Sequence, residues 1–475
     1  MDNQSLHQVS EANPQVLEKK LGALDLFTIG FGAIIGVGWI VMIGEWINLG
    51  GGPYATALAF LVGSVFLLPI SMVFGEFSAA IPKAGGAIIY TEQAFGQRAS
   101  YFTGWFLTLA YIMMCPWEVV AIGQLAETLI PALKVLPLYT IQGYTIYLPT
   151  LILCILVACS ILAINNIGVD RVAGVQKILV FFLLAISMIA IIVSLLRGSL
   201  QNTLPSSVST PLNPEGSFLI GFLTVLAMTP FFYSGFDTIG QGVEEVSALS
   251  NARRIGLVSP LSVCTAAIFY VIVILAVSMA VPWYELLSMN LPAAEVFSVG
   301  LGMNFLKVIV IGGAFCGLIT TLNSFFIAGA RVLLSMGRAQ MIPSYFAKVH
   351  PRYHTPINAN YIIGILSLAG AFLGKSVLLP ITNVCSFGFM LAWFMVGLSS
   401  IRIKRQQPNL KSPFAIPMWV NHIAVVTSGA MLVLLVFPGS PGALAWPLEI
   451  GIVIAWLFLG VIFYVLFDQL RSSTN

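Results

Sequence analysis

Long apolar runs separated by short polar connections occupy most of this 475-residue chain. Most of the runs reach the ~20 residues that a helix needs to cross a bilayer, and they lack the two-residue alternation of barrel strands. The pattern predicts an all-α polytopic membrane protein with twelve transmembrane helices. The expected spans are residues 24–48, 54–80, 98–129, 148–165, 172–196, 218–242, 256–281, 303–336, 357–374, 377–403, 416–437 and 446–467.

Two of these spans are interrupted near their middle. Four glycines fall within residues 30–38 of the first span, and glycine is a weak helix former. Close helix packing through Gly32 and Gly36 would explain this run, and so would a deliberate break. In the sixth span, Pro230 removes a backbone hydrogen bond and Gly235 weakens the next turn. Because interrupted helices in corresponding positions of two halves are typical of a transport site, the second interruption favours the break.

The two interrupted spans are five spans apart, which predicts two repeats that are inverted relative to each other in the membrane. We expect a transport core over residues 21–403, with repeats at about 21–197 and 216–403. Residues 1–20 would form a cytoplasmic N-terminal tail. Residues 404–475 would hold the last two transmembrane helices and a short cytoplasmic C-terminal tail.

Composition and charge agree with this class of protein. The chain is 58% hydrophobic and 8% charged, whereas soluble domains carry roughly 25% charged residues. If the N-terminus is cytoplasmic, 17 of the 21 Lys and Arg residues lie on the cytoplasmic side, as the positive-inside rule requires. We therefore expect a multi-pass protein of the cell (inner) membrane with both termini inside. The net charge of +3 reflects this loop bias and does not suggest a nucleic-acid partner.

The sequence offers no centre for catalysis or metal binding. The six cysteines fall within expected spans and the four histidines lie in the tail or near loops, without metal-ligand spacing. No set of His, Cys or Asp suggests a nucleophile. We therefore expect neither an enzyme nor a bound metal or cofactor.

Two carboxyl groups lie inside apolar runs, at Glu118 in the third span and Asp237 in the sixth. An acid at this depth is costly and is a functional candidate. A low-dielectric setting favours the protonated form, so either group suits proton binding and release; a structural hydrogen bond to a neighbouring helix is the alternative. Four charged residues nearer the cytoplasmic ends would close an inner gate as ion pairs, or only anchor loops. They are Glu76, Glu244, Glu245 and Arg331.

Four stretches together resemble the amino acid–polyamine–organocation (APC) superfamily of permeases. They are residues 32–38, with glycines spaced as G-x-x-x-G-x-G, residues 74–87, residues 235–237 followed by 244–246, and residues 329–338 followed by 342–343. Their order and spacing cover nearly the whole chain. The resemblance implies a LeuT-like fold, in which 5+5 inverted repeats with broken helices 1 and 6 are followed by two extra helices. It also implies transport by alternating access.

A substrate site at the two breaks follows from backbone chemistry. N–H groups exposed in the first break would bind a carboxylate, helped by the positive end of the half-helix that follows. Carbonyls of the second break would accept from an ammonium, and nearby aromatic rings would form the side-chain pocket and a gate, or only pack between helices. The expected binding residues are Ile34, Ile35, Gly36, Val37, Gly38, Trp39, Trp117, Phe231, Phe232, Tyr233, Ser234, Gly235 and Phe236.

The expected coupling or gating residues are Asp237, Glu118, Thr320, Thr321 and Ser324. The last three would supply oxygen ligands to sodium, together with first-helix carbonyls, or only bond back to the preceding turn. Some proton-coupled members of the superfamily carry a lysine in the fifth helix. The matching position here falls at about Leu183, so that mechanism is not expected. Exchange, proton symport and sodium symport stay open, in that order.

These features predict a secondary active transporter for amino acids, working as an exchanger or an ion-coupled symporter. A transporter of polyamines or other organic amines is the alternative, and it would rely on Asp237 or Glu118. The scarcity of intramembrane acids slightly favours a zwitterion. A substrate-sensing receptor on the same scaffold is a remoter alternative. The expected partners are the substrate, a coupling proton or sodium ion, and the lipid bilayer; the oligomeric state stays open.

Overall fold

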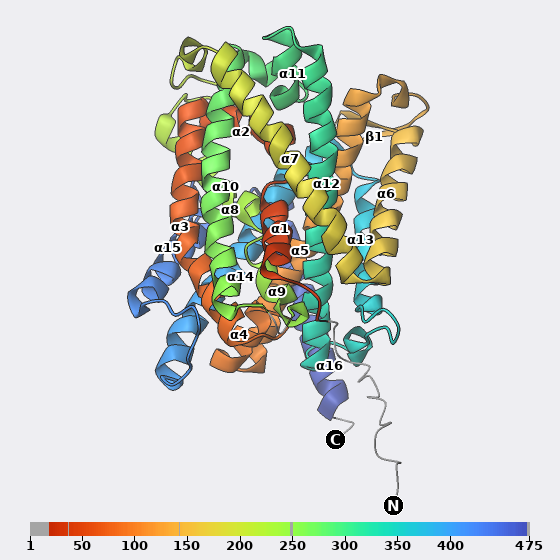
Figure 1. Cartoon of the computed structure of the whole chain (residues 1–475), viewed down its shortest axis with the longest axis vertical. Helices are drawn as coiled ribbons and strands as arrows, with labels where there is room; N and C mark the ends of the chain where they lie inside the picture. The colour runs from red at the N-terminus through yellow and green to blue at the C-terminus, as the bar shows by residue number, and fades with distance from the viewer. Residues whose placement is uncertain (1–18, 37, 142, 248–249, 473–475) are drawn as a thin grey trace, which may run out of the picture.

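The computed structural model describes residues 19–36, 38–141, 143–247 and 250–472. Val37 and residues 1–18 of the expected N-terminal tail therefore lie outside the described residues. Most of the long helices run along the long axis of the molecule (Figure 1). Helix α11 and strand β1 lie at its upper end in this view, and α4 lies at its lower end.

Helices account for most of the described chain. The α-helices are α1 (Ala23–Ile34), α2 (Gly38–Gly50), α3 (Pro53–Ala80), α4 (Ala87–Phe95), α5 (Gln97–Leu129), α6 (Leu148–Ile167), α7 (Val169–Arg197), α8 (Phe218–Tyr233), α9 (Thr238–Gly242), α10 (Ala252–Ala280), α11 (Pro292–Val299), α12 (Asn304–Arg338), α13 (Ile357–Gly370), α14 (Leu378–Gln406), α15 (Met418–Val436) and α16 (Leu448–Ser472). Short 3-10 helices are η1 (Pro131–Leu133), η2 (Leu200–Thr203), η3 (Val243–Glu245), η4 (Trp283–Ser288), η5 (Ser344–Ala347) and η6 (Lys375–Val377). Strands β1 (Pro137–Ile141) and β2 (Tyr144–Tyr147) form an antiparallel hairpin.

Within the described residues, eleven segments are helical, long and apolar enough to cross a membrane. They correspond to eleven of the twelve expected spans and confirm a multi-pass, all-α membrane protein. The remaining expected span, 357–374, contains α13, which has only 14 residues. At 1.5 Å per residue it is about 21 Å long, shorter than the ~30 Å hydrocarbon core. Helices α4 and α11 and the β-hairpin are elements that the hydrophobic pattern did not predict.

Both expected helix breaks are confirmed. Helix α1 ends at Ile34, and Ile35 leaves helical geometry with φ −92° and ψ 64°. Helix α2 then starts at Gly38. Helix α8 ends at Tyr233, Gly235 adopts a φ of +136°, and the short α9 follows. Because a positive φ strains any residue with a Cβ, glycine is what the second break requires.

The interrupted helices lie at the centre of the packing. Helix α1 contacts α7, α10 and α12, while α8 contacts α3 and α14. Around them, α3 packs against α10, and α5 packs against both α12 and α14. Helix α16 is at the periphery and leaves large apolar side chains such as Phe458 exposed. The fold therefore encloses both breaks among other helices and turns an apolar rim outward.

Candidate functional site

The two breaks pack directly against each other through glycines. A Cβ added to Gly235 would lie 2.6 Å from the carbonyl oxygen of Gly30. A Cβ added to Gly38 would lie 2.9 Å from the ring of Phe232. Because real side chains do not approach so closely, these positions have room only for glycine. The glycines therefore serve close packing as well as the breaks, and both explanations of the run apply.

One hydroxyl group bridges the two breaks. Tyr270 on α10 places its hydroxyl 2.6 Å from the carbonyl oxygen of Ile34 and 3.1 Å from that of Phe232. Both carbonyls belong to the last turn of a helix, where intrahelical donors run out. Tyr270 therefore satisfies backbone groups that the breaks leave free. Sequence reasoning missed this residue, although a tyrosine inside an apolar run is a visible signal.

A small cavity of about 10 Å³, which we call the central cavity, lies between the breaks. This volume suffices for about one water molecule. In this conformation the central cavity is too small for an amino acid. Of the expected residues, those that line it are Ile34, Gly36, Gly38, Trp117, Phe231, Phe232, Glu118 and Thr321.

Three expected aromatic residues do not line the central cavity but pack between helices. Trp39 packs edge-on against a phenylalanine of α10. Tyr233 donates its hydroxyl hydrogen to the carbonyl oxygen of Phe60, at 2.9 Å. Phe236 packs against Trp393 with ring centroids 4.6 Å apart. For these three, the geometry agrees with the packing alternative.

Carbonyls of the second break already have partners. The oxygen of Phe231 accepts from the hydroxyl of Ser234 at 2.6 Å and from its N–H at 3.3 Å. The oxygen of Phe232 faces Tyr270. Ile35 and Gly235 lie in the non-helical turns of the two breaks. The N–H of Ile35 donates to a carbonyl oxygen in the last turn of α1. An ammonium group at these carbonyls would have to displace existing donors.

Asp237 is buried and fully partnered. Its Oδ2 accepts from the hydroxyl of Tyr111 at 2.6 Å and from the indole N–H of Trp393 at 3.2 Å. Its Oδ1 accepts from the N–H of Gly235 at 3.0 Å. The carboxyl group therefore joins α5, α14 and the second break and does not line the central cavity. This geometry matches the structural alternative.

Glu118 is the acid that lines the central cavity. Its side chain is buried, and among the described residues its Oε2 has no hydrogen-bond partner. A buried polar atom without a partner is costly. Gly38, the first residue of α2, lines the same cavity, and the N–H groups that begin a helix lack intrahelical acceptors. The cavity therefore combines an acid with a donor-rich helix end.

The hydroxyl groups expected to bind sodium face α1. Thr321 donates to the carbonyl oxygen of Gly32 at 3.2 Å, and Ser324 donates to that of Ile29 at 3.0 Å. Thr320 lies 3.5 Å from the Gly32 oxygen and bonds the preceding turn at 2.8 Å. These hydroxyl groups and the α1 carbonyls form an oxygen cluster. The described residues hold no group of three or more His, Cys, Asp or Glu that could bind a metal.

An amide from α7 reaches this oxygen cluster. The Nε2 of Gln176 donates to the carbonyl oxygen of Thr320 at 3.0 Å and to the hydroxyl of Ser324 at 2.9 Å. The residue of the fifth span that faces the cluster is therefore Gln176, about two turns before Leu183. Leu183 instead packs in the apolar core. A single amide in an apolar run was the signal that sequence reasoning overlooked.

Ion pairs hold together the end of the molecule where α12 and η3 meet. Arg331 pairs with Glu245 at 2.6 Å, with both side chains only 2% exposed. Arg338 pairs with Glu244 at 2.9 Å, and Glu76 pairs with a lysine of α14 at 2.7 Å. The expectation that Glu76, Glu244, Glu245 and Arg331 form ion pairs is confirmed.

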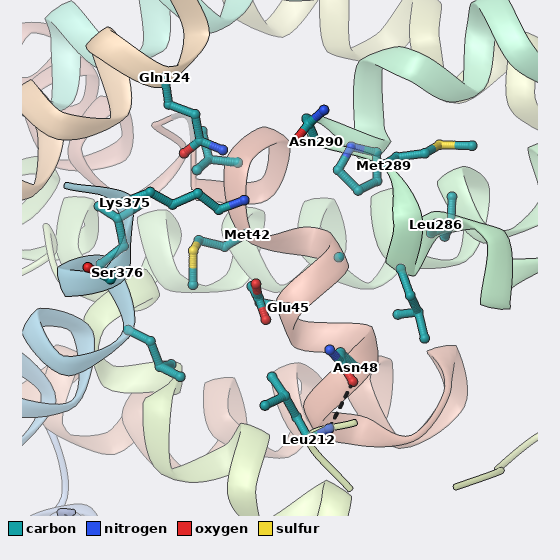
Figure 2. A pocket seen from close by; sticks show the side chains of 16 residues that line it. Met42, Glu45, Asn48, Gln124, Leu212, Leu286, Met289, Asn290, Lys375 and Ser376 are labelled. Atoms are coloured by element: carbon teal, nitrogen blue, oxygen red, sulfur yellow. Dashed lines mark hydrogen bonds between the residues drawn. The ribbon is translucent and has the colours of Figure 1, made fainter. Parts of the chain in front are cut away.

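A second cavity, which we call the large cavity, has a volume of about 330 Å³. It is lined by side chains from α2, the segment from η4 to α11, and the segment from η6 to α14. Figure 2 shows Glu45, Lys375 and Gln124 extending into this space. The large cavity shares no lining residue with the central cavity.

Comparison with known proteins gives consistent relatives. The chain is 26% identical to the methylthioribose transporter of Bacillus subtilis over 98% of this chain and 97% of the relative. It is 25% identical to the branched-chain amino acid permease BcaP of Bacillus subtilis over 97% of this chain and 95% of the relative. It is 27% identical to the chloroplastic cationic amino acid transporter 6 of Arabidopsis thaliana over 82% of this chain and 67% of the relative.

The family comparison agrees with these relatives. The model of the amino acid permease family matches residues 21–465, nearly the whole chain. This family and the three relatives are permeases and transporters, not enzymes, as expected. The match is consistent with the APC superfamily, and the chain belongs to the amino acid permease family.

Proposed function

We propose that this protein is a secondary active transporter that moves amino acids across the cell (inner) membrane by alternating access. The observation that carries the proposal is the meeting of two interrupted helices at a cavity lined by Glu118, whose Oε2 has no hydrogen-bond partner among the described residues. Backbone groups freed inside a membrane need water or a ligand. A protein with only a structural role has no need of such a site.

An inverted repeat of spans one to five and six to ten is supported by the helix contacts. Exchanging α1, α3, α5, α6 and α7 with α8, α10, α12, α13 and α14 reproduces several of the main helix contacts. The contacts of α1 with α7 and α10 become those of α8 with α14 and α3, and the contact of α5 with α14 becomes that of α12 with α7. The repeats lie within the proposed core, residues 21–403, and α15 and α16 follow it.

Alternating access needs a state in which one end of the protein is closed. The ion pairs between α12 and η3 would close one end in this way. Arg331 and Glu245 tie α12 to η3, and Arg338 and Glu244 add a second tie beside them. With both termini cytoplasmic, as the Lys and Arg distribution favours, this end faces the cytoplasm. The large cavity would then open toward the opposite side. Release inside would require these pairs to separate.

Substrate binding is proposed at the central cavity after it widens. The carboxylate would accept from N–H groups at the start of α2, near Gly38, where the helix dipole is positive. The ammonium would pair with Glu118, because the carbonyls of Phe231 and Phe232 already have donors. The other lining residues, such as Met114, are largely apolar, which favours a neutral amino acid, in line with the branched-chain relative.

An amine or a cationic amino acid is the second candidate substrate. The specific observation in its favour is the Oε2 of Glu118, which has no hydrogen-bond partner among the described residues, because a cation would neutralise this carboxylate. Relatives named cationic amino acid transporters agree with this candidate. A neutral ligand without an ammonium group, such as the substrate named for the methylthioribose relative, would leave the charge of this carboxylate without a counter-ion.

Exchange stays the first choice for coupling. The amide of Gln176 occupies the oxygen cluster around Thr320 and Ser324, so a sodium ion would have to displace it. Proton coupling through Glu118 requires no such displacement, because this acid lines the central cavity. The order of exchange, proton symport and sodium symport is therefore kept.

Flux measurements in proteoliposomes test the proposal. Purified protein would be given a labelled amino-acid mixture, with and without unlabelled amino acids inside. Uptake that needs internal substrate indicates exchange, and uptake driven by an imposed proton or sodium gradient indicates symport. Saturable flux of an amine but of no amino acid would overturn the amino-acid assignment. Binding without flux would favour the receptor alternative and contradict transport.

A further inference from the structure

Two side chains of opposite charge line the large cavity without forming an ion pair with each other. Glu45 projects from α2, and Lys375 projects from η6 on the other side of the space (Figure 2). Among the described residues, no ion pair joins either side chain to a partner. By contrast, ion pairs elsewhere among the described residues, such as Arg331 with Glu245, have N···O distances of 2.6–2.9 Å. The cavity therefore holds an acid and a base apart from each other.

A buried amide adds a third polar group. Gln124 on α5 is only 6% exposed, and its Oε1 has no hydrogen-bond partner among the described residues. Its side chain extends into the large cavity (Figure 2). Since buried polar atoms are normally partnered, this amide indicates a missing ligand or water.

We propose that the large cavity is a binding site for the zwitterion of an α-amino acid, separate from the central cavity. Lys375 pairs with the carboxylate, Glu45 pairs with the ammonium, and the amide of Gln124 bonds either group. A volume of about 330 Å³ lies within the range of small-molecule sites. The choice of an amino acid as ligand rests on the proposed function.

Apolar walls complete the site. Met42 and Leu286 line the same space as the charges and leave room for an apolar substrate side chain. The wall shared with the central cavity includes Trp117, whose indole N–H donates to the carbonyl oxygen of Leu378 at 3.1 Å. Trp117 lines the central cavity and Leu378 lines the large one. An amino acid bound in the large cavity would thus lie next to the central cavity.

Charge-removing substitutions test this site in proteoliposomes. Lys375→Gln and Glu45→Gln are each expected to raise the substrate concentration for half-maximal uptake about tenfold, the effect of one lost charge-assisted hydrogen bond. Lys134→Gln and Glu285→Gln are matched controls, because both side chains are exposed and outside the cavity. These controls are expected to leave uptake unchanged.

The two substitutions together identify the ligand's chemistry. If Glu45→Gln weakens uptake while Lys375→Gln strengthens it, the site takes a cation and the zwitterion proposal is overturned. If both variants behave like the controls, the site is overturned while the transport function stands. If the wild-type protein shows no amino-acid flux, the transport function fails instead. Binding of labelled amino acid to the purified protein, weakened by both substitutions, would still support the site in that case.

Discussion

At the scale of single residues, the two intramembrane acids have different surroundings. Asp237 meets three donors from three parts of the fold. Glu118 lines the central cavity with one oxygen unpartnered among the described residues. From the sequence alone, both acids were candidates for a functional role because each lies inside an apolar run. Their neighbours on other helices separate a structural acid from one placed for a ligand.

Glu118→Gln tests the ligand-facing acid. We expect uptake to fall at least tenfold, because a charge-assisted bond to the substrate ammonium becomes a neutral one. Stability should be kept or should rise, since a buried carboxyl group without a partner is removed. The readouts are initial uptake rate in proteoliposomes and the thermal unfolding midpoint of the purified protein. Wild-type uptake in this variant would contradict the role.

Asp237→Asn tests the structural acid. The amide NH₂ would have to face either Gly235 or the Tyr111–Trp393 pair, which are all donors. We expect a loss of about 1–3 kcal/mol of stability from the mismatched buried group. Thermal unfolding of the purified variant measures this, beside Asp237→Glu as a charge-preserving control. An unchanged unfolding midpoint would show that these bonds contribute little.

At the scale of elements, the glycines of the first break are spacers between helices. Gly36 lies against Thr321 of α12, and an added Cβ would overlap the threonine hydroxyl. The hydrophobic pattern predicted the breaks because glycine and proline weaken a helix locally. It did not predict α4, α11 or the hairpin, because short elements in connections lack a long periodic signal.

Gly36→Ala tests the spacing at the first break. We expect uptake to fall strongly, because the methyl group would push α1 away from Thr321 and from the central cavity. Gly312→Ala is the matched control, since a Cβ at that helical position meets open space and alanine favours the helix by up to ~1 kcal/mol. Uptake assays of both variants at equal protein amount decide the matter. Equal activity of the two variants would argue against a tight first break.

At the scale of the whole molecule, ion pairs join elements that are far apart in the chain. Arg331 and Glu245 are 2% exposed, whereas Lys177 and Asp25 form a pair with side chains 35% and 17% exposed. Desolvated pairs are sensitive to the loss of one partner, and exposed pairs contribute little. The closed state proposed above would therefore depend most on the buried pair.

Removing one or both partners of this pair tests that dependence. Arg331→Met removes the ion-pair partner of the buried Glu245 carboxylate and should cost about 3–5 kcal/mol of stability. The double variant Arg331→Met with Glu245→Leu should recover most of the loss, because no uncompensated charge remains. Lys177→Met is the control and should cost less than about 1 kcal/mol. Thermal unfolding compares all three, and equal losses in the single variants would contradict the argument.

The sequence by itself determined what depends on local composition and spacing. Long apolar runs specified a membrane protein of many helices, and glycine, proline and an acid marked the two interrupted spans. Ile34, Gly36, Gly38, Trp117, Phe231, Phe232, Glu118 and Thr321 were all named from the sequence and line the central cavity. These features could be predicted because each depends on residues close together in the chain.

Only the tertiary structure decided which side chains from distant helices meet. Tyr270 joins the two breaks, Gln176 fills the oxygen cluster, and Asp237 is partnered by Tyr111. The placement of Glu45 and Lys375 in one cavity also depends on the fold, since 330 positions separate them. Hydrogen bonds form only between groups that lie a few ångströms apart in space. Those distances cannot be read from the order of residues along one chain.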